Sequence, residues 1–308
     1  MEEKLISRRA VCKLPALAPW AFKASAAQRN MYLALNSVLV SNRVPWPDFA
    51  RLAAKTGYPG TDVMLAPAMK AGISATNDLF SELKIKPAAI NFPVEFRKDD
   101  ATFQAGLSKL DEAAQFASAI SCPRMVTYIM PSSDTPKDEL RRTYKQRFTE
   151  SARVLARSNV RLALEFLGPL EFRKAKPHEF IWRMNEMLEF AKECGPNVGL
   201  LLDSWHWHHA GATTQDIIDA GRNRIVHVHF NDAPNLPPDQ IRDDHRLLPG
   251  EGVINLVGFL KALQTIGYTD ALSVEVFGRL KDVPPEQAAK MGLDASLAVF
   301  RKAGVPEG

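Results

Sequence analysis

Short apolar runs alternate with amphipathic segments along most of the chain, beginning at Tyr32. Eight runs have the length of strands and are apolar at nearly every position, which is typical of parallel strands buried on both faces. They cover residues 32–40, 60–66, 88–93, 124–130, 160–168, 198–206, 225–232 and 271–277. Segments with helical spacing of apolar residues lie between them, among them 47–57, 102–121, 137–158, 180–195 and 255–267.

This alternation of strands and helices predicts parallel pairing with right-handed crossovers. Eight such units close most naturally into one α/β domain, a (β/α)8 TIM barrel, which we expect over residues 31–308. An open doubly wound sheet is the alternative. It is disfavoured because neither a GxGxxG motif nor a phosphate-binding loop follows the first strand.

The first 30 residues allow two interpretations. "SRRAVCK" (Ser7–Lys13) has the pattern of a twin-arginine export signal, and Ala24–Ala26 fits a cleavage site. The apolar stretch between them is short and contains two prolines, so a basic tail explains the segment equally well. We therefore expect a cytoplasmic protein, or a periplasmic one where the signal is functional.

Composition excludes several classes of protein. The net charge of +4 is spread along the chain, and the densest basic run, residues 141–147, has the pattern of a solvated helix face. A clustered basic stripe with aromatics, which nucleic-acid binding requires, is missing. The three cysteines are far apart and form neither a disulfide framework nor a zinc knuckle. No stretch approaches the ~20 apolar residues of a membrane span.

Ionisable residues interrupt the last four apolar runs near their carboxyl ends. They are Glu165, Asp203, the pair His227 and His229, and Glu275. The carboxyl ends of the strands are where TIM barrels carry their chemistry. Each residue alone could have a structural partner, but four consecutive strands with this feature favour a common site.

Three carboxylates that converge without a cation repel one another, and a divalent metal ion removes this conflict. Glu165, Asp203, His229 and Glu275 form a mostly oxygen donor set, suited to Mn²⁺, with Mg²⁺ or Co²⁺ as alternatives. We favour His229 over His227 as the ligand because it lies nearer the end of the strand. His227, two residues earlier on the same face, is expected to be a hydrogen-bonded core histidine.

The order Glu, Asp, His, Glu on the last four strands resembles the sugar phosphate isomerase/epimerase family, the xylose isomerase-like barrels. The resemblance covers about residues 32–303. It implies substrate contacts for Glu171, six residues after Glu165, and for His206, three residues after Asp203. "LPGEGVINLVGFLKALQTIGY" is similar to the loop and helix that precede the last strand of the family.

The chain departs from the 3-epimerases of this family in one loop. They carry an Arg six residues after the metal-binding His, where this chain has Asn235 in a longer, proline-rich loop. Arg242 or Arg246 could take this place.

Besides His206, four aromatic residues follow Asp203 closely in the sequence. His208 and His209 lie further along the expected loop, where solvated or packing roles fit best. Trp205 and Trp207 suit either an apolar wall for a sugar ring or ordinary packing.

The resemblance implies a metal-dependent isomerase or epimerase that moves a proton next to a carbonyl of a small carbohydrate or polyol, through an enediolate. Glu165 and Glu275 would be metal ligands and proton carriers at once. A lyase acting on a keto-sugar, of the inosose dehydratase or C-glycoside deglycosidase type, needs the same machinery. Phosphodiester hydrolysis fits the same fold, and so does a non-catalytic carbohydrate-binding barrel. Whether the chain forms a homo-oligomer stays open.

Overall fold

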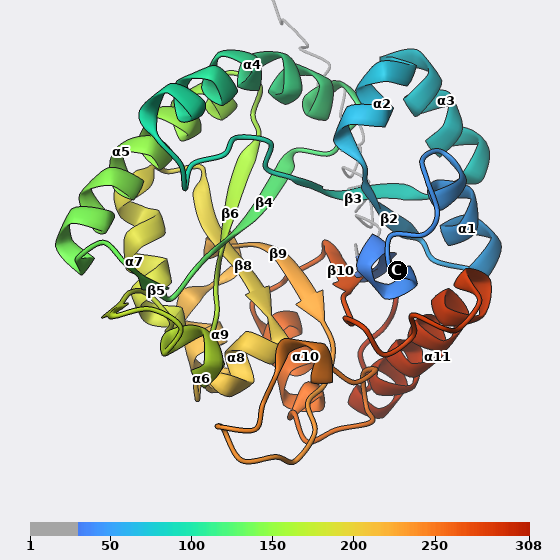
Figure 1. Cartoon of the computed structure of the whole chain (residues 1–308). Helices are drawn as coiled ribbons and strands as arrows, with labels where there is room; N and C mark the ends of the chain where they lie inside the picture. Colours follow the sequence, from blue (N-terminus) through green and yellow to red (C-terminus); the bar gives the residue numbers. More distant parts are fainter. Residues whose placement is uncertain (1–29) are drawn as a thin grey trace, which may run out of the picture.

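The computed structural model describes residues 30–308, and these form a closed barrel of eight parallel strands surrounded by helices (Figure 1). The order around the barrel is β1-β10-β9-β8-β6-β4-β3-β2. The barrel strands are β1 Tyr32–Leu35, β2 Gly60–Val63, β3 Lys86–Asn91, β4 Arg124–Ile129, β6 Arg161–Phe166, β8 Val198–Asp203, β9 Ile225–Phe230 and β10 Ala271–Val274. The predicted TIM barrel is therefore confirmed. The predicted Ser7–Lys13 signal lies outside the described residues.

The helices occupy the segments between the strands and the segment after the last strand. They are α1 Asp48–Thr56, α2 Leu65–Ala71, α3 Ile73–Leu83, α4 Asp100–Ala119, α5 Lys137–Ala156, α6 Leu170–Arg173, α7 Met184–Cys194, α8 Ser204–His209, α9 Thr214–Ala220, α10 Leu256–Thr265 and α11 Pro285–Ala303. Three short 3-10 helices are η1 Ser37–Val40, η2 Arg222–Arg224 and η3 Asp243–His245. Two residue pairs, β5 Ser132–Ser133 and β7 His178–Glu179, form a small antiparallel sheet. No helix among residues 30–308 is long and apolar enough to cross a membrane.

Several predicted strands end earlier than the apolar pattern suggested, and two of them end at a side chain that caps the following helix. The run 32–40 forms a strand only to Leu35 and continues as η1, because the Asn36 side chain accepts a hydrogen bond from the Val38 amide and caps it. The run 198–206 ends at Asp203, whose side chain caps α8 in the same way. His208 and His209 therefore lie on a helix rather than in the expected loop.

Two apolar layers hold the barrel together. The larger one lies between the strands and the surrounding helices. Inside the barrel, a smaller cluster includes Ala163 and Leu201. Side chains alternate along a strand, so residues two positions further on, Glu165 and Asp203, point to the same interior at the carboxyl ends. Cys122 and Cys194 are free thiols, both buried.

Candidate metal centre

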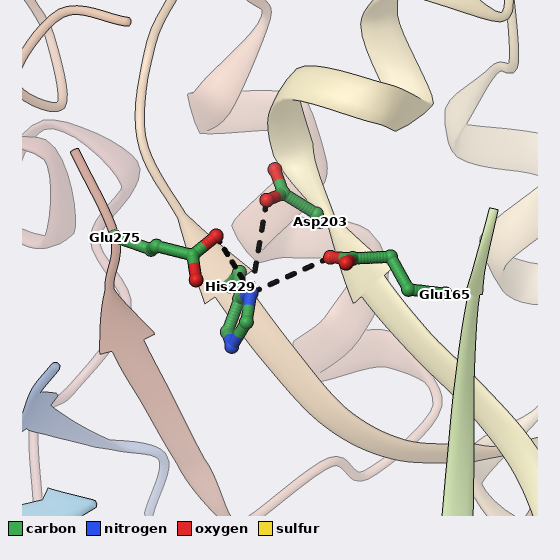
Figure 2. A group of neighbouring side chains, drawn as sticks. All are labelled: Glu165, Asp203, His229 and Glu275. Carbon is green, nitrogen blue, oxygen red and sulfur yellow. Dashed lines mark ion pairs between the residues drawn. The ribbon is translucent and has the colours of Figure 1, made fainter. Parts of the chain in front are cut away.

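The four predicted ligands converge at the carboxyl end of the barrel. Glu165 is on β6, Asp203 ends β8, His229 is on β9, and Glu275 follows the last residue of β10. Asp203 and His229 are paired across neighbouring strands. One potential ligand atom from each residue lies within 4.8 Å of the others, and all four residues are buried. Figure 2 shows Glu165 and Glu275 on either side of the His229 ring, with the Asp203 carboxylate near the carboxylates of these two glutamates.

Nδ1 of His229 faces all three carboxylates. It lies 3.0 Å from Oε2 of Glu275, 3.4 Å from Oε1 of Glu165 and 3.7 Å from Oδ2 of Asp203. Oε1 of Glu165 and Nδ1 of His229 are buried and make no hydrogen bond within the described residues. Buried polar atoms are normally satisfied, so these two atoms indicate a missing partner.

The two carboxylate oxygens of Asp203 have different hydrogen-bond partners. Oδ1 accepts hydrogen bonds from the Trp205 amide at 2.7 Å and from the Asn231 side chain at 2.9 Å. This leaves Oδ2 directed at the cluster, where it accepts a hydrogen bond from Nη1 of Arg246 at 2.7 Å. The start of α8 therefore fixes the orientation of the carboxylate.

Arg246 is one of the two candidate arginines in the long loop, and it reaches the cluster. Its side chain is 2% exposed, and Nη1 also donates to Oε2 of Glu275 at 2.9 Å. Nη2 donates to Oδ1 of Asp243 at 2.9 Å and lies 3.2 Å from Nε2 of His206. One guanidinium compensates only part of the charge of three carboxylates.

The loop that carries Arg246 is anchored by Asp232. The buried Asp232 carboxylate accepts hydrogen bonds from the amides of Gly250, Gly252 and Ile254 at 2.9–3.0 Å. Asp232 and Leu247 also exchange two backbone hydrogen bonds of 2.9 Å. A Cβ on Gly252 would lie 2.2 Å from the Ala233 carbonyl oxygen, so this position of the "PGEG" segment requires glycine.

The pKa values of the cluster follow from burial and neighbouring charge. Burial raises the pKa of Glu165 to about 7. Burial also disfavours the charged form of Asp203, but the Arg246 guanidinium outweighs it and holds the pKa of Asp203 well below its ordinary value. For His229, burial is again outweighed, and the carboxylate of Glu275 together with its neighbours raises the imidazole pKa well above its ordinary value.

This donor set fits a divalent cation. With His229 as a neutral ligand, three carboxylates against one guanidinium leave two negative charges, and an unpaired nitrogen and oxygen already face the same point. Within residues 30–308, this is the single group of three or more candidate ligands found.

A cavity of about 490 Å³ opens onto the cluster. Glu165, His206, His229, Arg246 and Glu275 are among the residues that line it. Burial lowers the pKa of His206 to about 3, so its imidazole is neutral at ordinary pH. Nδ1 of His206 has no hydrogen-bond partner among the described residues.

Glu171, the other predicted substrate contact, does not line this cavity. It lies on α6, where Oε1 accepts a hydrogen bond from the Asp243 amide at 2.8 Å and Oε2 lies 3.7 Å from Nε of Arg242. Arg242 is half-exposed. In this arrangement Glu171 holds the loop that precedes Arg246, and its predicted contact with substrate stays a prediction.

The two tryptophans after Asp203 have packing roles. Trp205 is fully buried and packs against the His209 ring, with centroids 4.4 Å apart. Trp207 is 4% exposed and packs edge-on against Phe259. Neither lines the cavity.

Sequence reasoning missed Asp62, on β2. Its carboxylate accepts hydrogen bonds from Nδ2 of Asn36 at 2.9 Å and from Oγ of Ser273 at 2.7 Å. Burial raises the pKa of Asp62 to about 6. Asp62 is an ionisable residue in the apolar run 60–66, so the test that found the other carboxylates could have found it. His227, expected to be a hydrogen-bonded core histidine, lies 2.9 Å from the same Ser273 hydroxyl through Nε2.

Residues 50–301 match the family model described as "Xylose isomerase-like TIM barrel". This match covers most of the chain, so the protein belongs to the xylose isomerase-like TIM barrel family.

Two curated relatives are enzymes. An inosose isomerase of Halalkalibacterium halodurans is 29% identical over 227 residues, which cover 72% of this chain and 78% of that protein. A 3-dehydroshikimate dehydratase of Pseudomonas aeruginosa is 37% identical over 109 residues, which cover 34% of this chain and 17% of that protein.

Two solved structures have the same fold. A xylose isomerase domain protein of Alicyclobacillus acidocaldarius is 27% identical, with a TM-score of 0.82 over 89% of this chain and 99% of that one. The IOLI protein, whose crystal structure holds a zinc atom, is 24% identical, with a TM-score of 0.76 over the same shares.

Proposed function

We propose that this protein is a divalent-metal-dependent isomerase or epimerase of a small carbohydrate or polyol, which moves a proton on a carbon next to a carbonyl. The observation that carries the proposal is the buried convergence of Glu165, Asp203, His229 and Glu275 within 4.8 Å. We propose these four residues as the metal ligands. The similarity to inosose isomerase supports the reaction class.

We propose Mn²⁺ as the ion, with Mg²⁺ or Co²⁺ as alternatives. Three carboxylates and one imidazole form a hard, mostly oxygen donor set without a thiolate. Imidazole and carboxylate also bind zinc, which the IOLI protein holds. Elemental analysis of protein purified from its native host distinguishes these ions.

Glu165 and Glu275 are proposed as the proton carriers. A divalent cation held by the four ligands would polarise a carbonyl and the hydroxyl on the next carbon, and so would acidify the C–H bond of that carbon. Glu165 and Glu275 come from β6 and from the end of β10 and both line the larger cavity, so a substrate carbon held there can meet both carboxylates. In the ion-free cluster burial raises the pKa of Glu165 to about 7, and a bound cation would lower it, which favours the carboxylate form that a general base requires.

His206 and Glu171 are proposed to bind substrate oxygens. The neutral His206 ring borders the cavity with an unpaired nitrogen, which suits a hydrogen bond to a hydroxyl. For Glu171, the proposal rests on the family spacing, and its carboxylate must leave the Asp243 amide to reach a substrate.

Dehydration of a keto-polyol is the second candidate. It begins with the same proton removal, and loss of a hydroxyl group then completes it. The 37% identity to 3-dehydroshikimate dehydratase favours this candidate, over the part of that enzyme that the match covers.

The test is isotope exchange catalysed by metal-loaded protein in D₂O. Ketoses and inososes are incubated singly, and products are analysed by mass spectrometry. Gain of one deuterium at unchanged composition supports isomerisation or epimerisation, whereas loss of water supports dehydration. Tight binding without exchange across the panel would contradict both candidates and favour a carbohydrate-binding barrel. Glu275→Gln protein, with its metal content measured, is the control.

A further inference from the structure

Two cavities meet at the acidic cluster. The cavity of about 490 Å³ lies on one side of it, and a second cavity of about 220 Å³ lies on the other. Asn91, Val126, His229 and Glu275 line both. A molecule held at the cluster can therefore extend in two directions, and the two directions differ in chemistry.

The smaller cavity combines apolar side chains with a row of polar ones, and it lacks a cationic wall. Asn36, Ser37, Asn42, Asp62 and Asn91 line it together with Glu275 and His229. Within the described part of the chain, no Lys or Arg contributes to this lining. Amide, hydroxyl and carboxylate groups bind neutral hydroxyls well, whereas the Asp62 carboxylate, with no Lys or Arg beside it in this lining, disfavours a phosphate at this end.

The Asp62 carboxylate in this cavity is held in place. Asn36 donates to one oxygen at 2.9 Å and Ser273 donates to the other at 2.7 Å. The Ser273 hydroxyl donates a hydrogen bond to Asp62. Its oxygen can therefore accept a hydrogen bond from Nε2 of His227, which lies 2.9 Å away. Each carboxylate oxygen of Asp62 keeps a lone pair that can accept from a substrate hydroxyl.

The larger cavity has an apolar wall. Phe92, Tyr128, Met130, Phe172 and Phe277 contribute to it. Of the two cavities, the larger one lies within the ~300–1,000 Å³ typical of pockets that hold drug-sized ligands. Hydroxyl groups that contact an apolar wall do not stabilise the bound ligand, whereas burial of an apolar ring there does.

Tyr128 joins this wall to the reacting centre. It is paired with Glu165 across β4 and β6, so the two side chains lie beside each other. Its side chain is 46% exposed, although large apolar groups elsewhere on the barrel strands are buried. The Arg97 guanidinium lies 4.3 Å from the centroid of the Tyr128 ring and supports it.

We propose that the substrate is a keto-sugar or keto-polyol that carries an apolar, ring-sized substituent. Its neutral hydroxylated end occupies the smaller cavity beside Asp62, and its carbonyl lies at the acidic cluster. Its substituent packs against the apolar wall of the larger cavity, which includes Tyr128. This inference rests on the proposed function and names its substrate class.

The test compares two substrates with the same reacting centre, the C-linked phenyl and C-linked methyl 3-oxo-glucosides, in which neither substituent is a leaving group. Solvent-deuterium exchange by the metal-loaded enzyme should show a kcat/KM at least about 10-fold higher for the phenyl compound, because burial of an aromatic ring outweighs burial of a methyl group. Calorimetry on the same pair should show the same preference in binding, and it tests the subsite without turnover.

Two variants test where the two ends of the substrate bind. Tyr128→Ala should reduce the phenyl-to-methyl ratio about 10-fold, whereas Ile218→Ala, at a 38% exposed position on α9 away from both cavities, should keep it. Asp62→Asn should raise KM for both compounds about equally and leave the ratio unchanged.

The outcomes separate the two proposals. Equal kcat/KM and equal affinity for both compounds in the unmodified enzyme would overturn the substrate class and leave the proposed function standing. Tighter binding of the phenyl compound without exchange of either would support the apolar subsite and contradict the proposed reaction. A phenyl preference that Tyr128→Ala does not reduce would also overturn the inference.

Discussion

Replacing Arg246 with Met removes a buried cation that contacts two of the candidate metal ligands. Nη1 of Arg246 lies 2.7 Å from Oδ2 of Asp203 and 2.9 Å from Oε2 of Glu275, and the side chain is 2% exposed. Met is unbranched and fills irregular space well, so lost charge rather than lost volume should dominate the effect. The Arg246→Met variant therefore measures how the three carboxylates are neutralised.

The expected magnitude follows from the charges. Breaking a buried ion pair leaves an uncompensated charge and costs about 3–5 kcal/mol. Three carboxylates are balanced by one guanidinium and one divalent cation together. In the variant the cation faces a more negative cluster, so we expect metal binding to stabilise Arg246→Met by at least about 1 kcal/mol more than it stabilises the unmodified protein.

The assay is urea unfolding at pH 7, first with a chelator and then with saturating Mn²⁺. Arg279→Met is the matched control, because Arg279 pairs with Glu251 at 2.8 Å while both side chains are more than a third exposed. Exposed pairs contribute about 0–1 kcal/mol, so this variant should lose little stability and respond to Mn²⁺ like the unmodified protein.

Two results would refute this reasoning. One is a loss below about 1 kcal/mol for Arg246→Met in the chelator, which would mean that the guanidinium does not compensate the cluster. The other is an equal stabilisation by Mn²⁺ in both variants, which would mean that the ion does not bind among these carboxylates.

Three further predictions concern the same site. Glu165→Gln and Glu275→Gln should each lower solvent-deuterium exchange ~10²-fold or more at equal metal occupancy, and undiminished exchange would remove that residue from the mechanism. Glu171→Gln and His206→Asn should raise KM with metal content retained, and loss of the metal would instead assign them a structural role. Without a metal ion, the pKa of Glu165 rises from its ordinary value of 4.5 to about 7 on folding. Between these two pH values the folded protein therefore binds more protons at Glu165 than the unfolded protein does. Stability should therefore fall by up to about 3 kcal/mol as pH rises through this range, and urea unfolding of Glu165→Gln should show a shallower fall; an identical pH dependence would contradict the assignment.

The sequence by itself determined the barrel and most of the cluster. Apolar runs that alternate with amphipathic helices leave few arrangements, because parallel strands need crossovers and must be covered on both faces. Glu165, Asp203, His229 and Glu275 each stand out in an apolar run, and the barrel brings the ends of its strands to one face. Local periodicity was sufficient to predict these four residues because the side-chain direction of each one follows from its position along its own strand.

The tertiary structure alone decided which loop residues join the site. Arg246 reaches the carboxylates because Asp232 anchors the loop, and Arg242 instead lies half-exposed beside Glu171. Asp62 meets the last strand through Ser273, 211 residues away in the sequence. No periodicity specifies a loop path or a contact between distant strands. These are set by backbone hydrogen bonds and side-chain packing that exist only once the barrel has closed.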